Sequence, residues 1–268
     1  MEGCAVTRER TFAAEQGQVP AGSCEVALII PARNEELSLP TVLKRVPALV
    51  SRVVVVDNGS TDQTAALARA NGAQVVHEPV PGYGSACLAG IAALADTPPA
   101  MVAFADADGS DGVENLEALL APLLSGEADL ALARRVTVTS RAMSPQQRFG
   151  NWLATRLIRL VWGHDYQDLG PMRVITWQAL RELDMKDRNF GWTVEMQIKA
   201  VKGGLRVKEV PLPYHVRIAG QSKISRTLAG VVRAGTKILW VIGREICRAD
   251  QKATARRSKP ARSVEETK

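Results

Sequence analysis

The chain has few cysteines, and they are widely separated. Its 268 residues include four: Cys4, Cys24, Cys87 and Cys247. No two of them form a C-x-x-C pair, and no histidine lies near them at ligand spacing. We therefore expect neither a disulfide framework nor a metal–thiolate site, which fits a reducing compartment.

Long apolar runs are also missing. No stretch approaches the ~18 uncharged apolar residues of a membrane span, and the first 15 residues carry several charges where a secretory signal needs an apolar run. We therefore expect a cytoplasmic protein. Hydrophobic residues make up 46% of the chain and charged residues 23%. These fractions are close to the globular average, which excludes a disordered or collagen-like chain.

The positive charge is concentrated at the C-terminal end. The formal net charge is +6, yet Arg217–Lys268 alone contains 13 basic and 4 acidic side chains. The rest of the chain is slightly acidic, so an anionic partner is expected at the C-terminal end. Residues 226–246 predict an amphipathic helix; its basic side chains are Arg226, Arg233, Lys237 and Arg244.

Strand and helix patterns alternate at short spacing in the first half of the chain. Apolar and β-branched runs predict strands at 26–30, 53–56, 74–76 and 101–105, and helical patterns lie between them at 36–50, up to 71, and at 86–95. This alternation predicts a doubly wound parallel α/β sheet that binds its ligand at the carboxyl ends of the strands. After Asp129 the pattern weakens, with helices expected at 148–163 and 193–202 and a strand at 205–210.

Polar clusters follow three of the expected strands. They are Pro31-Ala32-Arg33-Asn34-Glu35, the segment from Asp57 to Thr64, and Asp106-Ala107-Asp108. Because the carboxyl ends of parallel strands meet at one edge of a sheet, we expect the three clusters to form one site.

Asp106 and Asp108 flank a single residue at the end of an apolar strand. Two carboxylates placed there repel each other unless a cation lies between them, so Mg²⁺ or Mn²⁺ bridging to phosphate oxygens is the natural occupant. Asp111 is a candidate third or water-mediated ligand. The alternative is a solvated loop made of turn-forming Asp and Gly.

Two further segments suggest nucleotide binding. Asp57 can accept hydrogen bonds from a base or ribose, and Gly59 lets the backbone approach closely; the alternative is a turn in which Asp57 or Ser60 caps the next helix. Gly84 lies in Gly82-Tyr83-Gly84-Ser85-Ala86, which opens a helix and can turn backbone N–H groups toward phosphate.

Taken in order, these clusters resemble the family 2 glycosyltransferases of the GT-A fold. The likeness is greatest to the branch of dolichyl-phosphate mannose and polyprenyl-phosphate glucose synthases, and it covers about residues 25–224. Three downstream segments support it: Ala128–Arg135, Asp168–Arg173, and Glu209-Val210-Pro211 followed by Arg217–Lys223, which matches the branch signature E-V-P…R-x-x-G-x-S-K.

The resemblance implies a GT-A type, mostly parallel sheet with helices on both faces, and a role for each matching residue. Asp106 and Asp108 would bind the divalent metal, Mg²⁺ or Mn²⁺, on the donor diphosphate, and Arg217 would close over the phosphates. The nucleotide sugar would be held by Pro31, Asn34, Glu35, Asp57, Gly59, Ser60, Gly84, Ala107 and Lys223. The acceptor would meet Arg135, Arg173 and Trp192.

The sequence departs from that branch in three places. Ala133-Arg134 replaces Gly-Ser, Pro171-Met172 replaces Gly-Phe, and Trp192-Thr193 stands where members with hydroxyl acceptors carry Glu-Asp. The Asp of that pair is their base, and an acceptor that is already an anion needs none. The missing pair therefore favours a phosphate acceptor; if a base is used, Asp168 is the first candidate and Glu195 the second.

The leading hypothesis is an inverting, metal-dependent glycosyltransferase with a polyprenyl phosphate acceptor. The chain would divide into a flexible segment (1–24), a catalytic domain (25–224), an amphipathic helix (225–247) and a basic disordered tail (248–268). The helix would attach the protein peripherally to the anionic inner face of a membrane. One alternative is a soluble hydroxyl acceptor, with the helix packed on the domain. A nucleic-acid-binding module leaves the three clusters unexplained, so we expect no nucleic-acid partner.

Overall fold

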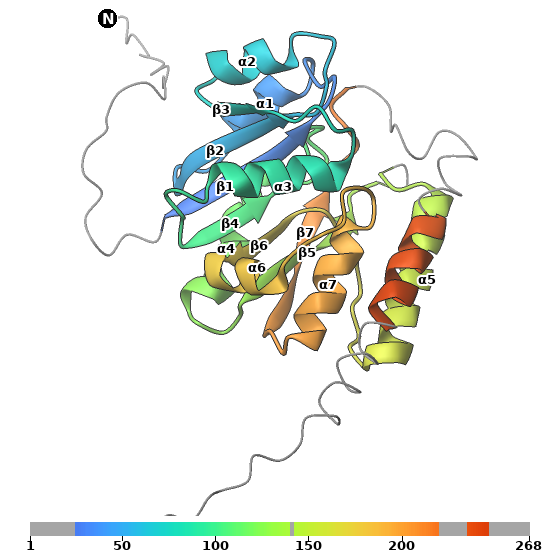
Figure 1. Ribbon diagram of the computed structural model, residues 1–268. Coiled ribbons are helices and arrows are strands. Elements are labelled where there is room, and N and C mark those ends of the chain that lie inside the picture. The colour runs from blue at the N-terminus through green and yellow to red at the C-terminus, as the bar shows by residue number, and fades with distance from the viewer. Residues whose placement is uncertain (1–24, 140–141, 220–234, 247–268) are drawn as a thin grey trace, which may run out of the picture.

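A seven-stranded sheet forms the centre of the molecule (Figure 1). The computed structural model of the chain describes residues 25–139, 142–219 and 235–246. The strand order is β3-β2-β1-β4-β6-β5-β7. The strands are β1 (Val26–Ala32), β2 (Val50–Asp57), β3 (Gln74–His77), β4 (Met101–Phe104), β5 (Leu130–Thr137), β6 (Arg173–Thr176) and β7 (Val207–Tyr214).

All neighbouring strands are parallel except at β6, which runs antiparallel to both β4 and β5. The central strands are buried on both faces. In β1, Leu28 and Ile30 belong to one apolar core, and Ala27 and Ile29 to the other. This two-sided burial explains why β1 is a continuous apolar run. The mostly parallel sheet confirms the predicted α/β class.

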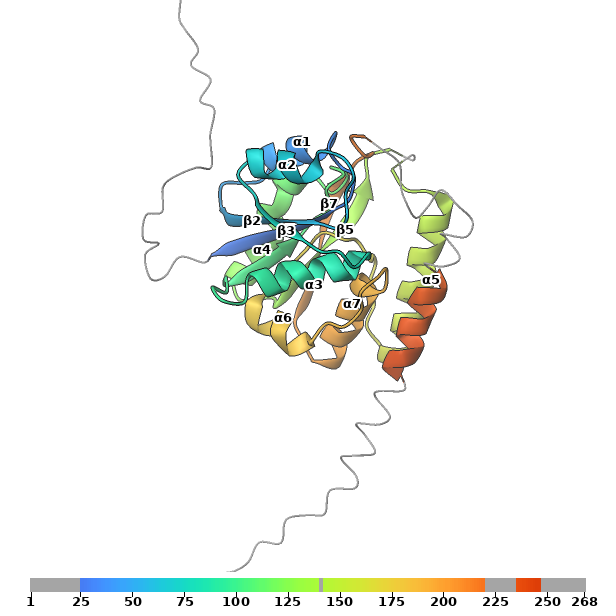
Figure 2. The same cartoon turned by 45° about the horizontal axis from the view of Figure 1, so that its top comes forward.

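Helices cover both faces of the sheet (Figure 2). Side chains of three helices contribute to the core on one face: α1 (Leu39–Lys44), α2 (Thr64–Ala70) and α4 (Leu116–Leu124). The core on the other face includes side chains of α3 (Tyr83–Ala93), α5 (Pro145–Trp162), α6 (Trp177–Leu183) and α7 (Trp192–Lys202). A 3₁₀ turn, Val113–Asn115, leads into α4.

The long helix α5 has strong local signals at both ends. Ser144 caps it by accepting a hydrogen bond from the Gln147 backbone N–H, and the Gln147 side-chain oxygen accepts one from the Ser144 N–H. Gly163 ends it in the left-handed conformation (φ 74°). A second helix, residues 235–246, lies beside α5 in both views (Figures 1 and 2). None of the helices in these described ranges is both long and apolar enough to cross a bilayer.

The structure differs from the sequence expectation in two places. The helix expected over 36–50 is reduced to α1, because the chain turns after Lys44 and β2 already begins at Val50. The β6–α6 unit was not expected, because a four-residue antiparallel strand has too short a pattern to recognise. Residues 1–24, the tail 248–268 and Lys223 lie outside the described residues.

Candidate active site

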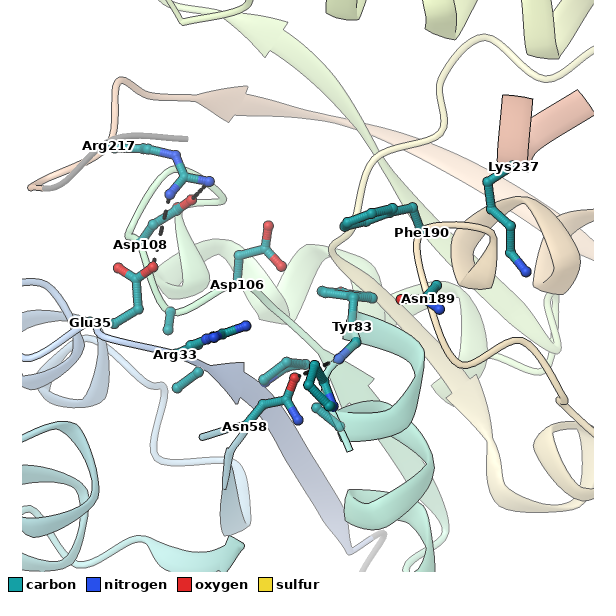
Figure 3. A pocket seen from close by; sticks show the side chains of 16 residues that line it. Arg33, Glu35, Asn58, Tyr83, Asp106, Asp108, Asn189, Phe190, Arg217 and Lys237 are labelled. Atoms are coloured by element: carbon teal, nitrogen blue, oxygen red, sulfur yellow. Dashed lines mark hydrogen bonds and ion pairs between the residues drawn. The ribbon is translucent and has the colours of Figure 1, made fainter. Parts of the chain in front are cut away.

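A pocket of about 590 Å³ lies at the carboxyl edge of the parallel strands (Figure 3). The segments that follow β1, β2 and β4 all contribute to its wall, as the strand-end clusters predict. The lining residues are Pro31, Ala32, Arg33, Glu35, Asn58, Pro81, Gly82, Tyr83, Ala86, Asp106, Ala107, Asp108, Asn189, Phe190, Arg217 and Lys237. Six of the predicted site residues are therefore brought together: Pro31, Glu35, Asp106, Ala107, Asp108 and Arg217.

Three carboxylates crowd the loop after β4. Asp111 accepts a hydrogen bond from the Asp106 backbone N–H (2.9 Å), and Asp108 accepts two from the N–H and hydroxyl of Ser110 (2.8 and 2.6 Å). Burial and the neighbouring Asp108 charge raise the pKa of Asp106 to about 7. Burial and the charges of Asp106 and Asp108 raise the pKa of Asp111 well above its usual value. Crowded, desolvated carboxyl groups of this kind are typical of functional sites.

Arg217 provides the opposing charge. Its guanidinium contacts Asp108 at 2.7 Å and Glu35 at 4.0 Å. The backbone holds this segment beside the acidic loop, because the Ile218 N–H donates to the Asp108 carbonyl (3.0 Å). Gly109 (φ 77°) permits the approach, since a Cβ there would overlap the Ile218 side chain. Arg217 follows β7, so it reaches these carboxylates from a segment that is far from them along the chain.

The acidic loop suits a divalent cation that takes part of its coordination from a ligand. Asp106 and Asp108 supply carboxylate oxygens, which Mg²⁺ and Mn²⁺ prefer. In the described ranges, no group of three or more His, Cys, Asp or Glu side chains forms a complete metal site. A cation held here would have positions left for phosphate oxygens, and it would relieve the repulsion that raises the pKa of Asp106.

Several predicted nucleotide-binding residues frame the pocket without lining it. Asp57 accepts a hydrogen bond from the Ser60 N–H (3.0 Å) and pairs with His77 (3.3 Å). The Ser60 hydroxyl accepts from the Asn34 N–H (3.0 Å), and Gly59 adopts a φ of 75° in the same turn. Asp57 and Ser60 therefore belong to a turn, but neither caps the next helix, because the N-cap of α2 is Gln63, which makes no side-chain capping hydrogen bond. These side chains fix the position of the loop that bears Glu35.

Gly84 also lies beside the pocket without lining it. A Cβ there would overlap the carbonyl oxygen of Asp187, and the next residue, Ser85, donates its N–H to the Arg188 carbonyl (2.9 Å). The loop between α6 and α7 therefore rests on the start of α3. Gly84 allows close approach to protein backbone, which differs from its expected contact with phosphate.

The residues expected to face the acceptor do not line the pocket. Arg135 and Asp168 form a buried two-point ion pair, with nitrogen–oxygen distances of 2.8 and 2.7 Å. Arg173 is 0% exposed and donates to the carbonyls of Gly170, Pro171 and Thr193, and burial lowers its pKa. Trp192 is buried against Phe104.

The second candidate base is likewise occupied. Glu195 accepts hydrogen bonds from the backbone N–H groups of Lys186 and Asp187 (3.0 and 2.7 Å) and pairs with Arg244 (2.8 Å) and Lys199 (3.1 Å). Neither Asp168 nor Glu195 therefore offers a free carboxylate to the pocket. Sequence alone cannot show this, because the Arg135–Asp168 and Arg244–Glu195 pairs each join segments far apart in the chain.

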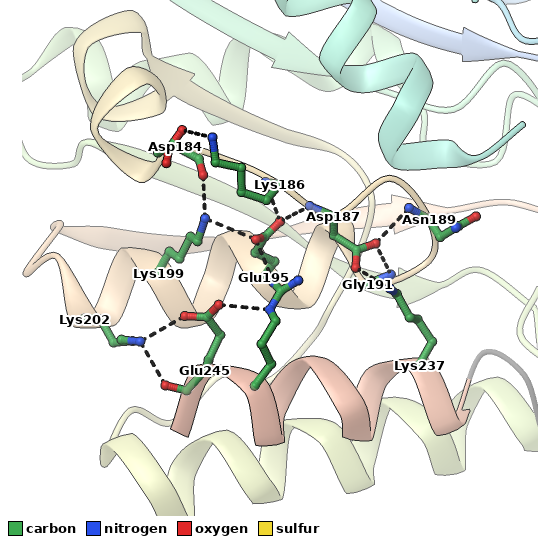
Figure 4. A network of polar contacts seen from close by, with 11 residues as sticks. Asp184, Lys186, Asp187, Asn189, Gly191, Glu195, Lys199, Lys202, Lys237 and Glu245 are labelled. Carbon is green, nitrogen blue, oxygen red and sulfur yellow. Dashed lines mark hydrogen bonds and ion pairs between the residues drawn. The ribbon is translucent and has the colours of Figure 1, made fainter. Parts of the chain in front are cut away.

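The helix at residues 235–246 turns its described cations inward (Figure 4). Lys237 pairs with the buried Asp187 (2.9 Å) and Arg244 with the buried Glu195, while Lys202 of α7 pairs with Glu245 (2.9 Å). The expectation that this basic face lies free for a membrane is wrong for Lys237 and Arg244, because buried carboxylates on the domain hold them. Arg226 and Arg233 lie outside the described residues.

Sequence reasoning missed several lining residues. Asn189 and Phe190 belong to the loop before α7, which carries no local motif, and Lys237 was recognised only as part of a basic helix face. Asn58 has a visible role: its side-chain amide donates to the Glu78 and Val80 carbonyls and its oxygen accepts from the Gly82 N–H. An Asn after a buried strand was the only signal for it.

Comparisons with known proteins agree with this geometry. The family model described as Glycosyl transferase family 2 matches residues 27–174. An uncharacterized glycosyltransferase of Mycobacterium tuberculosis is 43% identical over 209 residues, which cover 78% of this chain and 94% of that protein. A dolichyl-phosphate hexose transferase of Haloferax volcanii is 31% identical over 221 residues, covering 81% of this chain and 93% of its own.

A solved structure shares the fold. It is glucosyl-3-phosphoglycerate synthase from M. tuberculosis, crystallised with Mn²⁺, UDP and glucosyl-3-phosphoglycerate. It superposes with a TM-score of 0.62 at 25% identity, covering 82% of this chain and 80% of that one. With the strand-end pocket and the matched family model, this likeness leads to one conclusion: the chain belongs to glycosyltransferase family 2 and is a glycosyltransferase of the GT-A fold.

Proposed function

We propose that this glycosyltransferase moves a sugar from a nucleotide-diphosphate sugar to a polyprenyl phosphate, with a divalent cation and with inversion at the anomeric carbon. The observation that carries the proposal is the pair of carboxylates, Asp106 and Asp108, that face the pocket beside Arg217. The Haloferax relative is named for transfer to a dolichyl phosphate, and the solved neighbour was crystallised with Mn²⁺ and UDP. The first name supports the class of acceptor, and the second supports the class of donor and the cation.

On this proposal, Asp106 and Asp108 hold Mg²⁺ or Mn²⁺ and Glu35 and Pro31 bound the nucleotide side of the pocket. The cation would neutralise charge on the diphosphate as it leaves. Arg217 would exchange its contact with Asp108 for the phosphates, adding a second positive charge where negative charge develops. A nucleotide diphosphate at this site explains why one pocket combines crowded carboxylates with a cation from a distant segment of the chain.

The occupied carboxylates favour an acceptor that is already an anion. A hydroxyl acceptor needs a base within hydrogen-bond reach, whereas a phosphate monoester attacks as an anion at neutral pH. Asp168 and Glu195 are both held in ion pairs away from the pocket. Among the described lining residues, the carboxylates are Glu35, Asp106 and Asp108, and all three belong to the donor side.

An apolar surface on two adjacent helices supports a membrane-borne acceptor. It consists of exposed side chains of α5 and of residues 235–246: Phe149, Trp152, Leu160, Val161, Leu239, Trp240 and Ile246. Exposed aromatic and aliphatic side chains of this kind insert into the interface of a bilayer. We propose that this apolar surface, and not the basic face of the helix, makes the peripheral contact with an anionic membrane.

One observation favours the alternative of a soluble acceptor. The helix at 235–246 is held on the domain by ion pairs, as expected if it only packs there. The solved neighbour is named for making glucosyl-3-phosphoglycerate, whose acceptor is a water-soluble phosphate ester. Under this alternative, activity would not require prenyl chains or vesicles.

A transfer assay tests the proposal. The purified chain is incubated with Mn²⁺ and radiolabelled UDP- or GDP-sugars, with either a polyprenyl phosphate in detergent or 3-phosphoglycerate, and label in the product is counted. Asp108→Ala should abolish transfer, and EDTA should do the same. Asp165→Ala is the matched control, because Asp165 is exposed on the loop after α5. Undiminished transfer by Asp108→Ala, or in EDTA, refutes the mechanism.

A further inference from the structure

Two cations in the pocket, Arg217 and Lys237, come from outside the segment that the family model matches. Lys237 lines the pocket from the helix at residues 235–246, whereas the model ends at residue 174. In Figure 3 it lies with Asn189 and Phe190, across the pocket from Glu35 and Arg33. Its position is therefore opposite to the donor side.

Two neighbours hold the Lys237 ammonium in place. Its nitrogen lies 2.9 Å from the Asp187 carboxylate and 4.3 Å from the centre of the Trp240 ring. The other Asp187 oxygen accepts from the backbone N–H groups of Asn189 and Gly191 (2.8 and 3.2 Å). Asp187 thus fixes both the loop that carries Asn189 and Phe190 and the side chain of Lys237. An ammonium has three N–H donors, so the pair with Asp187 leaves donors for a ligand.

The same lysine lies where the pocket meets the apolar surface defined above. Trp240, which contacts Lys237, is 54% exposed, and Leu239 beside it is 46% exposed. One helical turn therefore joins a cation in the pocket to apolar side chains outside it. A ligand with an anionic head and an apolar tail matches this arrangement, because each part meets a surface of suitable chemistry.

We propose that Lys237 binds the phosphate group of the acceptor, so that the half of the pocket formed with Asn189 and Phe190 is the acceptor subsite. The inference rests on the proposed function for the identity of the acceptor. Lipid phosphates and soluble phosphate esters share the group that Lys237 recognises. The apolar side chains beside Lys237 favour the lipid, and the experiment includes both.

Binding is measured first, without donor, so that it does not depend on transfer. A short-chain prenyl phosphate and 3-phosphoglycerate are each titrated into the full chain, and intrinsic tryptophan fluorescence is followed. Wild type should bind the prenyl phosphate, and Lys237→Met should raise its Kd at least tenfold. Lys208→Met, on the exposed part of β7 next to Glu127, should leave Kd within twofold. Equal Kd values for wild type and Lys237→Met overturn the proposal.

A double variant separates binding from support of the loop. Lys237→Met leaves the buried Asp187 charge unpaired, which by itself could shift Asn189 and Phe190. Lys237→Met/Asp187→Asn removes that charge and keeps an oxygen for the two backbone N–H groups. If Lys237 binds phosphate, the double variant stays as weak as the single one. Recovery of wild-type Kd would show that Lys237 only positions the loop, and would refute the proposal.

Transfer kinetics distinguish a failure of the proposed function from a failure of the Lys237 subsite. In the active enzyme, Lys237→Met should raise the acceptor KM at least tenfold and leave the donor KM within twofold. A wild-type enzyme that binds the prenyl phosphate through Lys237 but transfers no sugar to it would contradict the proposed function alone. A normal acceptor KM in Lys237→Met would contradict the Lys237 subsite alone. Tighter binding of 3-phosphoglycerate, lost in the same variant, would keep the subsite and exclude the lipid.

Discussion

Replacing Asp106 by Asn should stabilise the cation-free protein, and the gain should depend on pH. Burial and the Asp108 charge raise the pKa of Asp106 from 3.8 to about 7. The folded state therefore binds this proton more tightly than the unfolded chain, and the wild type loses stability as the pH rises from about 4 to about 7. At 1.36 kcal/mol for each pKa unit, the full loss is ~4 kcal/mol. The amide of Asn does not titrate, so the Asp106→Asn variant avoids this loss of stability.

The assay is urea unfolding of both proteins in EDTA at pH 5, 6, 7 and 8. The unfolding free energy of the variant should exceed that of the wild type by an amount that grows up to ~4 kcal/mol at pH 8, or roughly 10 °C in Tm. Mn²⁺ with a nucleoside diphosphate should then stabilise the wild type and not the variant. A difference that is constant with pH, or a less stable variant at pH 8, would refute the crowded-carboxylate account.

Three further predictions follow from packing and exposure. Gly84→Ala should weaken acceptor binding at least tenfold, because its Cβ would overlap the Asp187 carbonyl and displace the loop that carries Asn189 and Phe190. Gly150→Ala in α5 meets no atom within 4 Å and should be neutral or add ~0.5–1 kcal/mol of stability; calorimetric titration and unfolding measure the two effects. Leu160→Glu (81% exposed) should reduce flotation with anionic vesicles, and Leu124→Glu (59% exposed) on α4 should not; equal flotation contradicts the apolar surface. Asp168→Asn should destabilise by ~3–5 kcal/mol in denaturant, since it leaves Arg135 buried without its partner.

The first half of the fold was predictable because its signals are local. Strand β1 and the Val53–Val56 part of β2 are continuous apolar runs, and each is followed by polar residues at the edge where ligands bind. The β6–α6 unit was not, because Arg173–Thr176 is too short for a period and its antiparallel pairing with β4 and β5 is decided by distant segments. The end of α1 was misjudged for a similar reason, since apolar residues around Val46 suit a helix or a loop over the core equally well.

The part of the pocket formed at the strand ends was predictable to the same degree. Pro31, Glu35, Asp106 and Asp108 line the pocket because they lie at or just after the ends of buried strands. The part formed by Asn189, Phe190 and Lys237 was not, because the sequence does not reveal which charged side chains pair with one another inside the fold.

Arg135, Arg173 and Glu195 each have the right chemistry for an acceptor site, yet buried carboxylates, carbonyls or cations from other elements occupy them. Lys237 shows the converse. It belongs to a helix read as a basic membrane face, and only tertiary packing brings it into the pocket.

The most direct test of the central claim is to isolate the product of transfer and determine its linkage. Wild type, Mn²⁺, the preferred nucleotide sugar and a short-chain prenyl phosphate should give a glycosyl prenyl phosphate whose anomeric configuration, read by NMR, is opposite to that of the donor. Asp108→Ala should give none, and Asp165→Ala should match the wild type. A product with the donor's configuration, or no sugar on any prenyl phosphate, would contradict the account.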